Sequence, residues 1–143
     1  MILQTAQGLL FEIQKWGCYF LSIAYFCEKD NGEPFTVDDL NKAFKDLLKV
    51  KAVDIECTVL NPDAIIARLN GKGKKFKGKA DAKYICAGNE FEIQEWYNIA
   101  TNYTHFVAGD GKGDVLWDSY GHSRTVREGK LTGKRIFIQE GNT

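Results

Sequence analysis

Several features that often reveal a protein's role are scarce in this sequence. Lys and Arg together number 19, and so do Asp and Glu, so the formal net charge is zero. Dedicated nucleic-acid binders usually carry a basic surplus, so we expect no nucleic-acid partner. The chain has only two histidines, and its four cysteines form no Cys-x-x-Cys pair. This argues against a zinc site, and we expect neither a metal nor another cofactor.

Long apolar segments are also missing. No apolar run approaches the roughly 18 residues that a membrane helix needs. Residues 1–17 show no basic region, apolar region or small-residue cleavage site of a secretory leader. We therefore expect a cytoplasmic protein that has no membrane partner and keeps four reduced thiols rather than two disulfides. The oligomeric state stays open.

The composition is that of a folded chain. Hydrophobic residues make up 44% and aromatic residues 13%, which excludes a disordered protein. A length of 143 residues suits one domain with a real core. We therefore expect a single domain over residues 1–143.

The first half of the chain has helical patterns. From Cys18 onward an apolar stripe predicts a helix that is buried on most sides and that ends at Gly32. Thr36, with Asp39 three residues later, forms a capping box for a second helix. Asn61, Pro62 and Gly71 mark the start and the end of a third.

The second half has strand patterns. The predicted strands are rich in aromatic and β-branched residues: 83–88, 91–97, 103–109, 114–118 and 134–140, with a further short one at 56–60. Residues 108–115 read as a hairpin loop. Helices followed by antiparallel strands indicate an α+β fold.

One segment is unusually rich in lysine. Six lysines lie between Lys72 and Lys83, interspersed with glycine. We expect residues 71–80 to be a mobile, exposed loop, because only Phe76 could anchor them. A flap, or a surface that meets an acidic partner, is the alternative.

Cys18 follows a glycine at the start of the buried helix. A thiol nucleophile needs a base, usually histidine, and a helix start favours a negative charge. His105 lies near the start of a predicted strand, whereas His122 lies in a polar turn and should be exposed. Asp118 is 13 residues after His105, which suits a hairpin that places the two side by side. The alternative is that Cys18 is an inert core thiol.

This order of residues resembles the papain-like cysteine peptidases. The chain is most similar to small bacterial and phage forms of the bacteriocin-processing C39 type. Gln14 lies in "IQKWGC", Cys18 follows, His105 lies in "THFVAG" and Asp118 in "LWDSYG". The resemblance implies a papain-like fold in which N-terminal helices, including the cysteine-bearing one, pack on a C-terminal antiparallel sheet.

The resemblance also implies an activity. Cys18 would be the nucleophile, His105 the base, Asp118 the group that orients it, and Gln14 the oxyanion donor, with Gln7 or the Cys18 backbone N–H as alternatives. The substrate would be a peptide or protein cleaved at an amide bond. The family usually has Cys-Gly-Pro at the nucleophile, whereas Tyr19 follows Cys18 here. A cell-wall amidase of related fold and a non-catalytic papain-like interaction protein are the alternatives.

Overall fold

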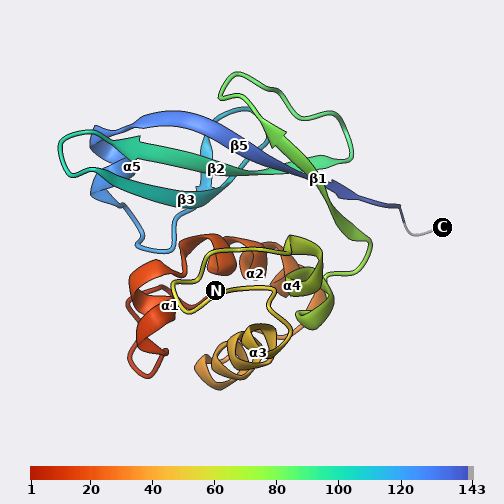
Figure 1. Ribbon diagram of the computed structural model, residues 1–143. Coiled ribbons are helices and arrows are strands. Elements are labelled where there is room, and N and C mark those ends of the chain that lie inside the picture. The colour runs from red at the N-terminus through yellow and green to blue at the C-terminus, as the bar shows by residue number, and fades with distance from the viewer. Residues whose placement is uncertain (142–143) are drawn as a thin grey trace. The chain divides into compact units, whose positions relative to one another are not determined.

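The computed structural model describes residues 1–141. Contacts divide the chain into two compact units, Met1–Lys72 and a second one that starts at Gly73. The first unit is helical, and the second contains a five-stranded antiparallel sheet (Figure 1). The α+β prediction is therefore confirmed, while the single domain and the packing of the cysteine helix on the sheet stay predictions.

The first unit contains four helices. They are α1 (Phe11–Trp16), α2 (Cys18–Asn31), α3 (Val37–Lys49) and α4 (Pro62–Arg68). Helix α2 begins and ends where the sequence predicts, because Gly32 follows it in the left-handed conformation with φ 71°. That conformation costs a glycine little and ends the helix.

Side-chain caps fix the starts of α3 and α4. The Thr36 hydroxyl accepts from the backbone N–H of Asp39, and the Asp39 carboxylate accepts from that of Thr36, which completes the predicted capping box. The Asn61 side chain accepts from the backbone N–H of Ala64. Helix α4 ends at Arg68, three residues before Gly71, because Asn70 already takes the left-handed conformation with φ 55°.

The core of the first unit surrounds α2. This helix buries side chains on most sides, as its sequence predicts, and Phe20 meets Phe44 of α3 edge to face at 6.0 Å. The fully buried large side chains of this unit are Gln4, Ile13, Phe20, Leu21, Leu40, Phe44, Leu47 and Ile65. All but Gln4 are apolar, so this unit is held mainly by apolar burial.

The second unit is a sheet with the order β1-β5-β2-β3-β4. Its strands are β1 (Lys74–Ala80), β2 (Glu90–Asn98), β3 (Tyr103–Gly109), β4 (Val115–Trp117) and β5 (Lys130–Gln139). The last strand lies between the first and the second, and every pair is antiparallel. A short helix, α5 (Arg124–Glu128), precedes β5 and was not predicted.

Three local predictions were wrong. The lysine-rich segment is not a loop, since most of it forms β1, which pairs with β5 and packs Phe76 against Phe137. Residues 83–88 form no strand, although their aromatic and β-branched composition predicts one. Residues 56–60 contribute only an isolated bridge between Val53 and Val59.

Within residues 1–141, none of the helices combines the length and the apolar character that crossing a membrane requires. The cytoplasmic location stays a prediction.

Candidate active site

His105 and Asp118 form a hydrogen-bonded pair in the second unit. His105 is the third residue of β3, and Asp118 directly follows β4, which pairs antiparallel with β3. His105 Nε2 lies 2.8 Å from Asp118 Oδ1, and the two residues are 0% and 5% exposed. The hairpin contact predicted from their spacing is therefore confirmed.

Two backbone N–H groups also donate to the Asp118 carboxylate. Oδ1 accepts from the N–H of Tyr120 at 2.9 Å, and Oδ2 accepts from the N–H of Ser123 at 3.0 Å. Burial by itself raises the pKa of Asp118. The hydrogen bonds from His105, Tyr120 and Ser123 outweigh this effect and hold the pKa below its usual range. Asp118 is thus a carboxylate at neutral pH.

This arrangement determines the tautomer of His105. A carboxylate only accepts hydrogen bonds, so His105 Nε2 must carry the proton that it shares with Asp118. In the neutral ring the lone pair then lies on Nδ1, the atom that can take up a proton. The rings of Tyr120 and Tyr103 lie 5.1 and 6.5 Å from the imidazole, centroid to centroid. These contacts restrict its rotation.

Cys18 is positioned by helix packing in the first unit. Helix α1 ends at Trp16, and only Gly17 separates it from Cys18, the first residue of α2. A Cβ atom on Gly17 would lie 2.5 Å from the carbonyl oxygen of Ile13, so the preceding helical turn requires glycine here. Cys18 is buried, and its carbonyl oxygen accepts from the Ser22 hydroxyl at 2.7 Å.

Gln14 lies on α1, four residues before Cys18. Its side-chain amide donates to the carbonyl oxygen of Ala6 at 3.0 Å, so it also fixes the N-terminal segment. Gln7, the alternative, is exposed. A third glutamine was missed: Gln4 is fully buried and donates to the carbonyl oxygens of Ile13 and Gln14, both at 3.1 Å. No sequence signal marks it, because it lies in an irregular segment.

The remaining cysteines differ from one another. Cys27 is fully buried on α2. Cys57 lies in a turn with φ 55°, not in a strand, and its thiol donates to the carbonyl oxygen of Glu12. Burial raises the pKa of Cys57 to about 12 and that of Cys86 to about 11. Both thiols are therefore protonated at neutral pH and unsuited to nucleophilic attack. His122 is exposed, as predicted.

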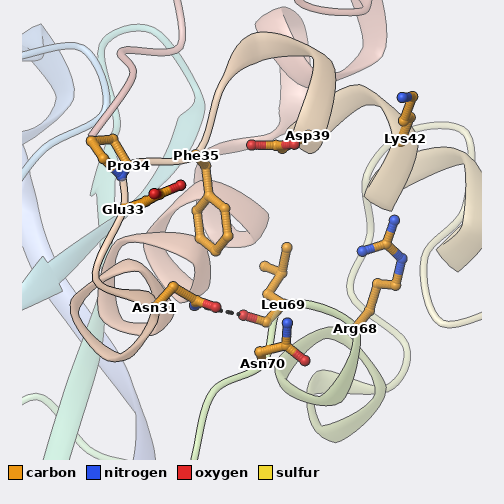
Figure 2. A pocket seen from close by; sticks show the side chains of 9 residues that line it. All are labelled: Asn31, Glu33, Pro34, Phe35, Asp39, Lys42, Arg68, Leu69 and Asn70. Carbon is orange, nitrogen blue, oxygen red and sulfur yellow. Dashed lines mark hydrogen bonds between the residues drawn. The ribbon is translucent and has the colours of Figure 1, made fainter.

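A separate polar pocket of about 270 Å³ lies in the first unit, where α2 ends, α3 begins and α4 ends. Figure 2 shows the Phe35 ring within it, with Arg68 and Lys42 at one side and the Asn31 amide bonded to the carbonyl oxygen of Leu69. None of the predicted site residues lines this pocket. Among the residues that the structure describes, no group of three His, Cys, Asp or Glu side chains could hold a metal ion.

Comparison with known proteins identifies a family. A family model described as "Protein of unknown function, DUF261" matches residues 1–139. No curated protein and no solved structure matches the chain. Since the family model spans nearly the whole sequence, the protein belongs to the DUF261 family.

Proposed function

We propose that this protein is a papain-like thiol hydrolase that cleaves a peptide or amide bond. The observation that carries the proposal is the buried hydrogen bond between His105 Nε2 and Asp118 Oδ1, 2.8 Å long. A carboxylate that holds one imidazole nitrogen leaves the other to move protons, which is the arrangement of catalytic triads on several unrelated folds.

Cys18 supplies the nucleophile in this proposal. It stands at the start of a 14-residue helix on a turn that only glycine permits. The raised pKa values of Cys57 and Cys86 disfavour both as nucleophiles. Buried Cys27, nine residues after Cys18, lies in the interior of α2 rather than at its start.

The reaction proceeds in two halves. His105 Nδ1 takes the Cys18 proton while the sulfur attacks the carbonyl carbon, and the oxygen takes the negative charge. The C–N bond then breaks, and the amine leaves with the proton from His105. A water molecule, deprotonated by His105, attacks the thioester and releases the acid and the Cys18 thiol. Asp118 stabilises the imidazolium in both halves.

The oxyanion needs hydrogen-bond donors. Gln14 and the Cys18 backbone N–H are the proposed ones. Gln4 braces the end of α1 but has no direct role.

Thiol labelling tests the proposal without a known substrate. Iodoacetamide is applied at pH 6, and the alkylated cysteines are identified by peptide mass. Cys18 should react at least about ten times faster than Cys27, and His105→Ala should remove most of that difference. His122→Ala is the matched control and should change nothing, because the His122 side chain is exposed and Asp118 is bonded to His105, Tyr120 and Ser123 instead.

Two probe substrates then separate the possible activities: a fluorescein-labelled denatured protein and purified peptidoglycan. Cleavage of the first that is lost in Cys18→Ala supports a peptidase, and cleavage of the second supports a cell-wall amidase. The double variant Cys18→Ala/His105→Ala should lose about as much hydrolytic activity as either single variant. An unreactive Cys18 in the wild type contradicts the proposal and leaves a non-catalytic interaction protein.

A further inference from the structure

A chain of polar side chains crosses the sheet of the second unit. Lys134 Nζ lies 2.8 Å from Glu92 Oε1, and Gln94 Nε2 donates to Glu92 Oε2 at 2.7 Å. Trp96 Nε1 donates to Gln94 Oε1 at 2.9 Å. We refer to Lys134, Glu92, Gln94 and Trp96 as the polar chain. Its first three members are fully buried.

The polar chain and His105 lie on the same face of the sheet. In the unbroken register of β2 and β3, Glu92 pairs with Gly109, Gln94 with Val107 and Trp96 with His105. Directly paired residues in an antiparallel sheet project to the same side, with their Cβ atoms about 5 Å apart. Trp96 is therefore the immediate cross-strand neighbour of His105.

The same chain holds the turn that leads to Asp118. The N–H of Gly113 donates to Glu92 Oε2 at 3.3 Å, and Gln94 Nε2 donates to the carbonyl oxygen of Asp114 at 3.0 Å. The ladder between β3 and β4 is short and irregular, with only Ala108–Trp117 and Gly109–Val115 in register. The side-chain bonds therefore add constraint where the ladder supplies little.

A glycine on β3 makes room for the polar chain. A Cβ atom on Gly109 would lie 2.3 Å from Glu92 Oε2 and 2.5 Å from Gln94 Nε2. The two side chains thus lie directly over the backbone at the end of β3, and no other residue fits there without displacing them.

Stability gives no reason to keep such a chain. Removing a lysine and a glutamate from water costs several kcal/mol per ion, and apolar replacements of buried ion pairs are often equally stable. A role in positioning side chains explains the charges better. Hydrogen bonds and ion pairs have a preferred geometry, so they fix the position of a side chain more specifically than apolar contacts do.

We infer that the polar chain is a positioning element for the His105–Asp118 pair. It anchors the Trp96 indole beside His105 and the 110–114 turn ahead of Asp118. The imidazole therefore keeps its proton on Nε2 and donates it in a hydrogen bond to the carboxylate. Its value for catalysis rests on the proposed hydrolase function, whereas its effect on the imidazole does not.

Nitrogen NMR of the histidine side chains tests the inference on the full chain without substrate. The chain has only His105 and His122, and the exposed His122 serves as an internal reference. In Gln94→Met, the Nδ1–H tautomer of His105 should rise at least about threefold, because the imidazole and Asp118 are no longer held in register. Trp96→Phe, which loses the indole donor but keeps an aromatic ring beside His105, should give a smaller rise in the same direction.

Glu95→Gln is the matched control. Glu95 lies on β2 between Gln94 and Trp96, faces the opposite side, and contacts Arg135 and Thr132. It should leave the His105 tautomer unchanged. Equal tautomer populations in the wild type, Trp96→Phe and Glu95→Gln would overturn the inference, even if Gln94→Met fails to fold. A shifted tautomer in a protein whose wild type shows no Cys18-dependent hydrolysis would support the positioning role and reject the proposed function.

Discussion

The two units bury different kinds of side chain. Around α2 the first unit buries apolar residues, and its buried polar side chains are Gln4 and Ser22. The second unit buries charged and polar side chains in its sheet and in the segment between β4 and β5: Glu92, Gln94, Asn98, His105, Asp118, Ser119, Ser123, Thr125 and Lys134. Apolar packing tolerates small shifts, while buried charges demand their partners. The stability of the second unit should therefore depend on individual hydrogen bonds and ion pairs and on pH. The stability of the first unit should depend on the volume of the side chains in its core.

Removing a buried charge should have the largest effect. Lys134→Met leaves Glu92 buried without its cation and removes the bond from Lys134 to the carbonyl oxygen of Tyr84. The free energy of unfolding should fall by about 3–5 kcal/mol. Urea unfolding measures this loss, and hydrogen exchange should show that it lies in β2 and β5.

The double variant Glu92→Leu/Lys134→Met is the control for this experiment. It removes both charges and should recover most of the lost stability, because no uncompensated ion remains. A double variant as unstable as the single one would mean that packing, and not charge, causes the loss.

Replacing Asp118 should have a somewhat smaller effect that depends on pH. Asp118→Asn places an amide where the carboxylate accepts from His105, Tyr120 and Ser123. At pH 7 the loss should be about 3 kcal/mol. The pKa of Asp118 is lower in the folded than in the unfolded chain, so its stabilising contribution is present above about pH 4 and disappears as the pH falls through the folded value.

The difference between Asp118→Asn and the wild type should therefore shrink steadily below about pH 4. Thermal unfolding between pH 2 and 8 measures it. Asp38→Asn, which alters an exposed carboxylate of the first unit, should show only a small difference at pH 7. A loss for Asp118→Asn that is equally large at every pH would contradict the role of the ionised carboxylate.

A change of volume tests the first unit, with the smallest expected effect. Gly17→Ala adds a methyl group 2.5 Å from the carbonyl oxygen of Ile13 and should cost about 1–3 kcal/mol. The loss should be independent of pH between 5 and 8, since no charge is involved. Gly88→Ala adds the same methyl group in open space and should cost little. Equal losses in the two variants would show that the turn before Cys18 is not tightly packed.

The sequence predicted the features that depend on local rules. Thr36 and Asp39 cap a helix whatever its surroundings, and Gly32 ends one because of its own conformational freedom. The His105–Asp118 contact was predictable for a similar reason, because a hairpin brings nearby residues together through a short loop.

Features that depend on distant partners were not predictable. The lysine-rich segment is a strand because β5, more than 50 residues later, pairs with it. Residues 83–88 look like a strand, but Tyr84 and Cys86 instead anchor a loop to Glu90 and Glu92. Nothing local in the sequence indicates that Glu92 is buried or that Lys134 meets it.

The lysines of β1 acquire a meaning from their place in the sheet. This strand is one edge of the described sheet, and Lys75, Lys77 and Lys79 are exposed along it. Another β1 strand that approached this edge would place its own ammonium groups against these. Edge strands rich in lysine are poor templates for pairing with other chains. The lysines of β1 therefore disfavour edge-to-edge pairing of strands between molecules and the fibrous aggregates that such pairing produces.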